Sequence, residues 1–187
     1  MESKTNVEQK LAESFKQLAI KTPIEKITIK EITDGAGVIR PTFYNHFQDK
    51  YELLEWIIRT EVLDSAMPLM KDGFFRESLI RIFTNLQQEK GFYSKVVRLE
   101  GQNSCETITR KIVKEVLLSS INEKVGNPKA AKKGLTTDLV AEYYAQSIAF
   151  VVIKWVKLNM SLSPEQMADV FQFMTSHSMH DVIEEMN

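Results

Sequence analysis

A short segment, residues 38–47, carries a dense set of side chains that could form hydrogen bonds with a nucleic acid. These side chains are Arg40, Thr42, Tyr44, Asn45 and His46. Arginine can donate two hydrogen bonds to guanine, asparagine can pair with adenine, and a threonine methyl can contact thymine. Tyrosine and histidine can bind phosphate oxygens. The apolar residues Val38, Phe43 and Phe47 lie between them, so the segment predicts a helix with one buried face and one face suited to DNA.

A second short helix is predicted immediately before this segment. Thr28-x-x-Glu31 is a capping box, in which each side chain accepts a hydrogen bond from the other residue's backbone N–H at a helix start. Gly35 and Gly37 end this helix and leave a turn of a few residues. Two short helices joined in this way have the dimensions of a helix–turn–helix, whose second helix enters the DNA major groove. A pair of bundle helices has the same spacing, but the polar face of residues 38–47 favours DNA binding.

The stretch IKEITDGAGVIRPTFYNHFQDKYEL, residues 29–53, resembles the signature of the TetR/AcrR family of bacterial transcription regulators. The resemblance implies a DNA-binding regulator that reads its operator through the helix Arg40–Phe47. By this resemblance, the residues that face the bases are Arg40, Pro41, Thr42 and Asn45. Those that hold the phosphate backbone are Thr28, Tyr44, His46 and Lys50.

One position departs from the family pattern. Ile39 stands where the family usually has a serine or threonine that caps the DNA-reading helix, and isoleucine cannot accept a hydrogen bond from the helix N–H groups. Pro41 compensates in part, because its ring fixes φ in the first turn and it has no N–H to satisfy.

The composition limits the classes of protein to which the chain can belong. With 187 residues, of which 43% are hydrophobic, the chain can bury one core and carry a small appended module. Its single cysteine, Cys105, excludes an intramolecular disulfide and fits a reducing compartment. The net charge is −1, and residues 26–50 carry four cations and three anions, a local excess of only 4 − 3 = +1. The prediction of DNA binding therefore depends on the placement of side chains and not on the overall charge.

Neither a targeting segment nor a membrane-spanning segment is predicted. Residues 1–6 lack the apolar core of a signal peptide. The most apolar run, Ile148–Trp155, contains Lys154 and is far shorter than the roughly 20 apolar residues of a spanning helix. We therefore expect a cytoplasmic protein.

The periodicity of apolar residues predicts an all-α fold of about nine helices. Residues 1–48 are expected to form a three-helix, helix–turn–helix DNA-binding domain, and residues 49–187 a helical dimerisation and ligand-binding domain. The predicted helices span residues 5–22, 28–36, 38–47, 49–67, 75–91, 93–99, 103–126, 135–159 and 163–185. An exposed loop is expected at residues 126–134, where Gly126-Asn127-Pro128 ends a helix.

The last two predicted helices are more apolar than one buried face requires, so we expect them to pair with a second copy of the chain. The residues expected at this homodimer interface are Val151, Val152, Trp155, Val156, Met167, Phe171 and Met174. A dimer would read the two half-sites of a near-palindromic operator, about 34 Å apart or a multiple of it. The alternative is that these residues belong to the core of a single subunit.

The family resemblance also implies an effector pocket among the middle helices. Its expected lining is Phe83, Leu86, Phe92, Tyr93, Val97, Tyr143, Tyr144, Gln146 and Phe150, although plain core is the simpler explanation for any one of them. The segment IKWVKLNMSLSPEQMADVF, residues 153–171, resembles the DhaS-like subgroup of the family. That subgroup implies a partner protein as effector and activation of transcription, whereas the family as a whole favours a small molecule and repression.

Other classes of function are less well supported by the sequence. His177 and His180 have i, i+3 spacing and Cys105 could be a third ligand, so a metal-responsive regulator is one alternative, with two solvated histidines as the simpler explanation. No phosphate-binding loop, zinc-protease motif or nucleophile elbow occurs, so we expect neither an enzyme nor a cofactor. A helical adaptor is the remaining alternative, and it would show no salt-sensitive DNA binding.

Overall fold

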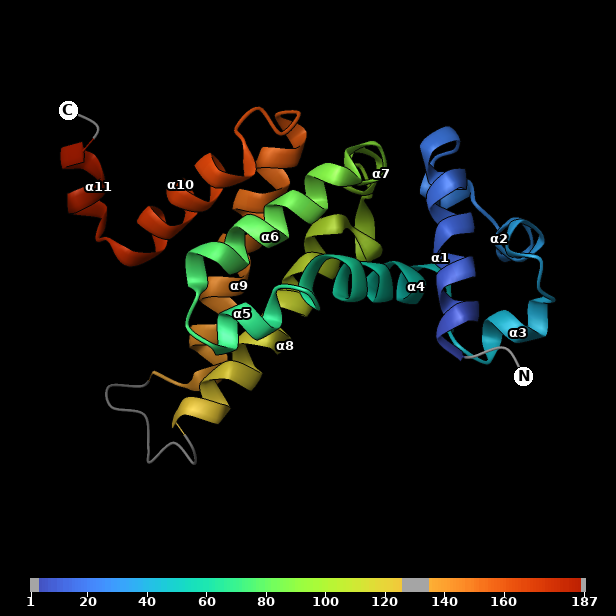
Figure 1. The fold of residues 1–187 in the computed structure, drawn as a ribbon, viewed down its shortest axis with the longest axis horizontal. Coiled ribbons are helices and arrows are strands. Elements are labelled where there is room, and N and C mark those ends of the chain that lie inside the picture. Colours follow the sequence, from blue (N-terminus) through green and yellow to red (C-terminus); the bar gives the residue numbers. More distant parts are fainter. Residues whose placement is uncertain (1–3, 126–134, 186–187) are drawn as a thin grey trace.

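The computed structural model describes residues 4–125 and 135–185, and the regular elements within these residues are all helical (Figure 1). The predicted all-α fold is confirmed. The described residues form eleven α-helices, two more than expected, because a short helix follows the predicted fourth helix and the predicted last helix divides in two. The loop expected at residues 126–134 lies outside the described residues.

The first three helices form a headpiece at one end of an elongated molecule, drawn in blue in Figure 1. They are α1 (Lys4–Lys21), α2 (Ile29–Ala36) and α3 (Arg40–Tyr44), with a short 3₁₀ turn, η1 (Ile24–Lys26), between α1 and α2. Leu11 and Phe15 of α1 are fully buried together with Ile32 of α2 and Phe43 of α3. Burial of these large side chains holds the three helices together.

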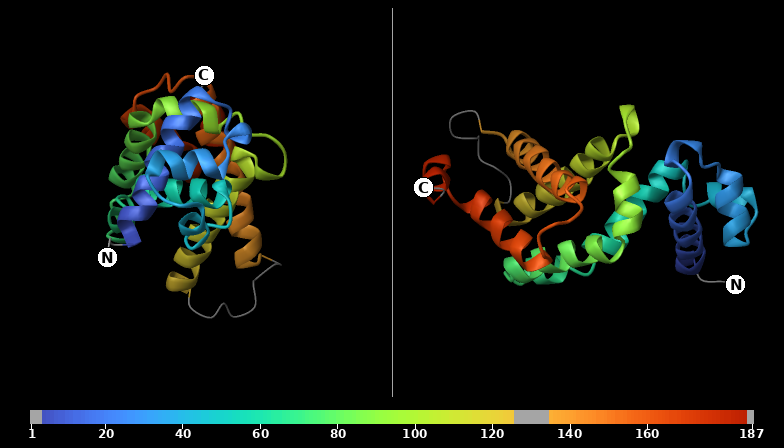
Figure 2. Two further views of the ribbon diagram at one scale, coloured as in Figure 1. Left: turned by 90° about the vertical axis from the view of Figure 1, so that its right-hand side faces the viewer. Right: turned by 90° about the horizontal axis from the view of Figure 1, so that it is seen from above.

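Helix α4 (Lys50–Ile57) connects the headpiece to the C-terminal half (Figure 1). The elements of that half are η2 (Ile58–Leu63), α5 (Met67–Lys71), α6 (Phe75–Gln88), α7 (Lys90–Val96), η3 (Gly101–Asn103), α8 (Cys105–Val125), α9 (Thr137–Lys157), α10 (Pro164–Ser176) and α11 (Met179–Glu185). Helix α9 packs along α8, and α10 packs against α6. Figure 2 shows α10 and α11 at the opposite end of the molecule from the headpiece.

The element η2 is a wider, π-helical continuation of α4. Its hydrogen bond from Asp64 N to Arg59 O, at 3.0 Å, joins residues five apart, whereas an α-helix joins residues four apart. The helix predicted for residues 49–67 therefore changes its geometry before its end. Pro68, directly after the predicted helix, lies in the first turn of α5.

The two halves share one hydrophobic core. The ring of Phe15 on α1 contacts the ring of Phe92 on α7, edge to face with centroids 6.0 Å apart. Beside these rings, Lys16 Nζ lies 2.9 Å from both carboxylate oxygens of Glu61 and 3.2 Å from Glu89 Oε1. The headpiece is thus joined to η2 and α7 by apolar contact and by a partly buried group of charges.

Several predicted helix ends are confirmed and others are wrong. Ser163 and Gln166 form a capping box at the start of α10, where the predicted helix 163–185 begins. Helix α8 begins at Cys105 and not at residue 103, because Ser104 Oγ accepts from Thr107 N at 3.1 Å and caps it. The last helix ends at Ser176, and a separate helix, α11, follows.

Helix α9 presents a different face to α8 than its large residues suggested. Its alanines Ala141, Ala145 and Ala149, spaced by four residues, are fully buried. Small side chains at this spacing let α9 approach α8 closely. Ion pairs join the same two helices, since Lys114 of α8 binds Asp138 and Glu142 of α9 at 2.7 and 2.9 Å. By length and composition α9 could also cross a membrane, a property it shares with core helices of soluble proteins.

Candidate nucleic-acid interface and regulatory pocket

Helix α2 is fixed at its start by the predicted capping box. Thr28 Oγ1 accepts from Glu31 N at 3.2 Å, and Glu31 Oε2 accepts from Thr28 N at 2.8 Å. The threonine hydroxyl also donates to the same carboxylate at 2.7 Å, and these bonds lower the pKa of Glu31. The hydroxyl of Thr28, expected to hold a phosphate, is therefore used within the headpiece.

The two glycines of the turn have different roles. A Cβ on Gly35 would lie 2.3 Å from Ser14 Oγ, so Gly35 allows α2 to approach α1. In this close contact Ser14 Oγ donates a buried 2.8 Å hydrogen bond to Ile32 O. Gly37 ends α2 in the left-handed conformation, with φ of 68°, which turns the chain toward α3.

Helix α3 is shorter than predicted, since it ends at Tyr44 and not at Phe47. Its N-cap is Ile39, whose side chain makes no capping hydrogen bond, as its apolar character led us to expect. Pro41 lies in the first turn, and Thr42 N donates to Ile39 O at 2.9 Å. The proline and this backbone bond start the helix in place of a polar cap.

The outer face of α3 brings together most of the predicted DNA-binding residues. Arg40, Pro41, Tyr44 and Asn45 are exposed, and Thr42 is half-buried. Arg40 Nη2 donates to Tyr44 Oη at 2.9 Å, and the guanidinium carbon lies 5.5 Å from the centre of the Tyr44 ring. The Tyr44 ring in turn packs edge to face on buried Phe43. The arginine is thus held in a defined position on a rigid support.

Two of the predicted DNA-binding residues are turned into the headpiece. His46, expected to point outward, is only 9% exposed at its side chain, and its Nδ1 lies 3.2 Å from Glu8 Oε1 on α1. Lys50 Nζ donates to Glu25 O and Ile27 O at 2.7 and 2.8 Å, and burial lowers its pKa. The outward prediction for His46 is wrong because the chain leaves the helix after Tyr44 and residue 46 falls over α1.

One exposed residue beside this face was missed by the sequence analysis. The Ile39 side chain is 69% exposed at the start of α3, next to Arg40. An exposed isoleucine could contact the methyl group of thymine, as other apolar side chains do in the major groove. One indication of this exposure was present in the sequence. Ile39 does not share the spacing of Val38, Phe43 and Phe47, the residues that mark the buried face.

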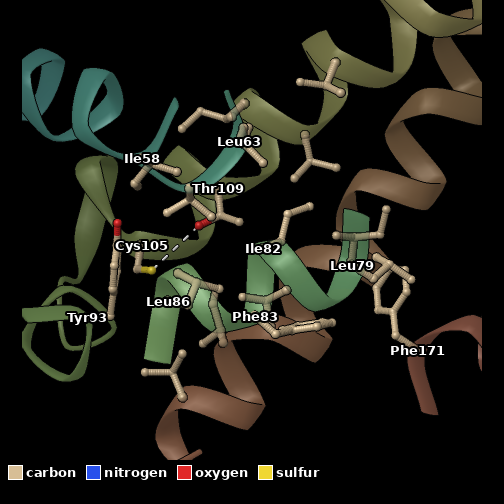
Figure 3. Close-up of a pocket in the computed structure, with 18 of the residues that line it drawn as sticks. Ile58, Leu63, Leu79, Ile82, Phe83, Leu86, Tyr93, Cys105, Thr109 and Phe171 are labelled. Atoms are coloured by element: carbon tan, nitrogen blue, oxygen red, sulfur yellow. Dashed lines mark hydrogen bonds between the residues drawn. The ribbon is translucent and has the colours of Figure 1, made fainter. Parts of the chain in front are cut away.

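A pocket of about 170 Å³ lies in the C-terminal half, between α6, α8, α9 and η2 (Figure 3). Its wall includes the predicted residues Phe83, Leu86, Tyr93 and Val97. Ile58 and Val62 of η2 also line it. The pocket is thus bounded on one side by the same segment that binds Lys16 of the headpiece.

Five of the residues predicted for this pocket lie elsewhere. Tyr143 and Phe150 are 67% and 65% exposed, Tyr144 is 41% exposed, and Gln146 lies on the surface, where it donates to Glu106 at 2.8 Å. The prediction is wrong because, between Ala141 and Ala149, alanines and not aromatic residues fill the buried face of α9. Phe92 is fully buried in the shared core, against Phe15.

The residues predicted for a dimer interface also divide into different environments. Trp155 and Met167 are buried within the subunit, where the Trp155 ring packs on Phe83 at 5.2 Å. Val152, Val156 and Phe171 line the pocket. Val151 is half-buried and Met174 is 52% exposed, and both border a groove of about 310 Å³ between α9, α10 and α11. The large exposed apolar residues of α9 and α10 are Leu139, Tyr143, Tyr144, Phe150, Leu158, Val170 and Met174.

The histidines considered as metal ligands have separate partners. His177 is the C-cap of α10 and stacks on the Phe173 ring with centroids 4.2 Å apart. His180 lies on α11, with Nε2 3.3 Å from Glu184 Oε1. Cys105 is buried in the pocket wall. Within residues 4–125 and 135–185, no group of three histidine, cysteine, aspartate or glutamate side chains could hold a metal ion.

Comparison with known proteins gives two family matches. Residues 16–57 match the model for bacterial regulatory proteins of the tetR family, and residues 75–177 match a model for the C-terminal region of transcriptional regulators. Together they cover the exposed face of α3 and most of the residues that line the pocket.

Individual relatives and solved structures that resemble this chain are also transcriptional regulators. The dhaKLM operon transcriptional activator DhaS of Lactococcus lactis is 29% identical over 94 residues, which are 50% of this chain and half the length of that activator. The transcriptional repressor KstR2 of Mycobacterium tuberculosis is 25% identical over 162 residues, 77% of this chain and 78% of the repressor. A putative TetR-family regulator from Syntrophomonas wolfei has a similar fold, with a TM-score of 0.62 and 18% identity over 90% of this chain and 92% of its own.

Proposed function

Because this chain belongs to the TetR family of bacterial DNA-binding transcriptional regulators, we propose that it acts as a cytoplasmic homodimer on a near-palindromic operator. We further propose that a small molecule bound in the pocket controls its affinity for DNA. The observation that carries the proposal is the exposed face of α3, where Arg40 and Tyr44 hold each other.

The side chains of α3 divide into two tasks in this proposal. Arg40, Thr42 and Asn45 contact base edges, because their hydrogen-bonding groups and the threonine methyl match the major-groove pattern. Tyr44 binds a phosphate and fixes the position of Arg40. His46 and Lys50 act indirectly, since their hydrogen-bonding groups orient the headpiece.

The dimer interface in this proposal is the exposed apolar face of α9 and α10. Tyr143, Phe150 and Met174 are large, apolar and largely exposed, and an exposed patch of this kind is typical of a subunit interface. In this proposal they take the place of Trp155 and Met167, which were predicted at the interface but are buried within one subunit. A two-fold axis through this face would present both headpieces to successive major grooves.

The pocket can influence the headpiece through η2. Ile58 and Val62 line the pocket, and Glu61, between them in sequence, binds Lys16 of α1. A ligand that favours one position of η2 therefore favours one position of the headpiece. We propose repression as the sign of regulation, because the match to the repressor KstR2 covers 77% of the chain and the match to the activator DhaS covers 50%.

The test is selection of genomic DNA fragments by the purified full-length protein at two salt concentrations. We expect a near-palindromic site whose affinity falls as salt rises, because phosphate contacts release counterions. Tyr44→Phe should weaken binding by at least about tenfold for each subunit, because a hydrogen bond to a charged group contributes about 1.5–3 kcal/mol and about 1.4 kcal/mol is tenfold in affinity. Thr107→Val is the control, because it removes an exposed hydroxyl from α8, away from α3 and outside the apolar face of α9 and α10, and it should bind DNA as the unaltered protein does.

Two results would contradict the proposal. Recovery of no site above background would leave a helical adaptor. Equal loss of affinity in Tyr44→Phe and Thr107→Val would contradict the role of α3. Phe150→Glu tests the dimer separately, because a charge at the centre of the apolar face should give monomers in sedimentation measurements.

A further inference from the structure

The wall of the pocket is almost entirely apolar. Of the residues that line it, Tyr93, Cys105 and Thr109 carry a hydroxyl or thiol group, and none carries a charge. Cys105 Sγ and Thr109 Oγ1 lie 3.8 Å apart and hydrogen-bond to each other. Figure 3 shows this pair beside Tyr93 at one end of the pocket, and Leu79 and Phe171 at the other end.

The hydroxyl of Tyr93 has no partner. Its oxygen is buried, and no hydrogen-bond acceptor in the described part of the chain reaches it. Burial raises the pKa of Tyr93 well above its usual value, and the nearby carboxylates of Glu61 and Glu89 raise it further, so the hydroxyl keeps its proton. A buried donor without an acceptor destabilises a protein, and an acceptor brought by a ligand removes that cost. Because the Tyr93 oxygen is closed off in the structure, the ring must turn toward the pocket for a ligand to accept this hydrogen bond.

The size of the pocket limits what can bind there. An engineered apolar cavity of about 150 Å³ in another protein holds benzene, so a pocket of about 170 Å³ takes a short chain or a single ring. The pocket lacks a cationic group for an anion and a carboxylate for a cation. Burying either kind of charge without a partner is strongly unfavourable.

We propose that the effector is a small, neutral, apolar molecule with one acceptor oxygen, of the ketone, ester or lactone class, which accepts a hydrogen bond from Tyr93 Oη. Its apolar body lies along α6 toward Leu79 and Phe171. This inference rests on the proposed role of the pocket in regulation. It adds the chemistry of the ligand and the residue that recognises it.

The test is calorimetric titration of the full-length protein, without DNA, with four probes of similar size. 2-Octanone is neutral with an acceptor, propylbenzene is neutral without one, octanoate is an anion and octylamine is a cation. We expect 2-octanone to bind most tightly. Tyr93→Phe should weaken 2-octanone about five- to tenfold and leave propylbenzene unchanged, because only one hydrogen bond is lost.

Two further measurements show whether Tyr93→Phe acts only through the loss of its hydroxyl. Tyr93→Phe without ligand should unfold at a higher temperature than the unaltered protein, because the unpaired hydroxyl is gone. Tyr51→Phe, on α4 and outside the pocket wall, should change neither the binding of 2-octanone nor the unfolding temperature.

Each contrary result overturns a specific part of the inference. Tighter binding of octanoate or octylamine than of 2-octanone would overturn the neutral ligand. If Tyr93→Phe weakened the binding of 2-octanone and of propylbenzene equally, the proposed hydrogen bond would be overturned. If none of the probes bound, the proposed ligand class would be overturned. The proposal of DNA binding would not be affected, because the selection of genomic fragments tests it separately.

Discussion

Replacing Glu61 by glutamine removes the charge that joins η2 to the headpiece. In the structure Lys16 Nζ lies 2.9 Å from both oxygens of Glu61, and the two side chains are only 12% and 19% exposed. Glu89 Oε1, 3.2 Å from the same ammonium, is 42% exposed and would remain. Lys16 in the variant would therefore keep its weaker partner and lose its stronger one.

The expected loss of unfolding free energy is about 1–2 kcal/mol. A hydrogen bond to a charged group contributes about 1.5–3 kcal/mol, and the lower part of that range applies because Glu89 still pairs with Lys16. For a protein of this size, that loss lowers the midpoint of thermal unfolding by about 2–8 °C. Glu115→Gln is the matched control, because its ion pair with Arg59 is exposed and such pairs contribute about 0–1 kcal/mol.

The pH dependence gives the same prediction a second test. Burial alone would lower the pKa of Lys16, but its bonds and charges with Glu61 and then Glu89 raise it above the ordinary 10.5. The stabilisation is therefore complete below pH 10.5 and is lost as pH rises through the higher pKa of the folded state. Calorimetry from pH 7 to 11.5 should show the Glu61→Gln difference shrinking above pH 10.5. A loss no larger than that of Glu115→Gln, or one that grows above pH 10.5, would refute this account.

Three further predictions concern the headpiece and the pocket. Thr28→Ala should cost about 1 kcal/mol in urea unfolding because α2 loses its cap, and an unchanged midpoint would contradict the role of the capping box. Gly35→Ala should destabilise the headpiece because the new Cβ meets Ser14, and adding Ser14→Ala should recover part of the loss; no recovery would point to another cause. Burial raises the pKa of Cys105 to about 11, so iodoacetamide should react slowly at pH 8 and quickly after unfolding, and equal rates would show an open thiol.

The headpiece could be predicted closely because its signals are local. The capping box at Thr28 and the left-handed turn at Gly37 each depend on residues within a few positions in sequence. His46 was misplaced because its environment depends on Glu8, 38 residues away. Contacts of that range leave no pattern in a single sequence.

The C-terminal half was harder to predict, because nearly every turn of α9 carries apolar residues on several faces. Large side chains were assigned to the interior, but Ala141 and its repeats fill the contact with α8, and Phe150 faces outward. The change to a π-helix at Ile58 has no clear local signal either. Both features are decided by packing between elements.

The π-helical turn also fixes the rotational phase between the two halves of the molecule. A π-helix holds one more residue per hydrogen-bonded turn than an α-helix, so deleting one residue from Ile58–Leu63 would restore regular α-helical winding. Each residue of an α-helix turns the chain by about 100°. Such a deletion would therefore rotate the headpiece about the axis of α4 or pull Glu61 away from Lys16. The length of this six-residue segment sets the direction in which α3 faces.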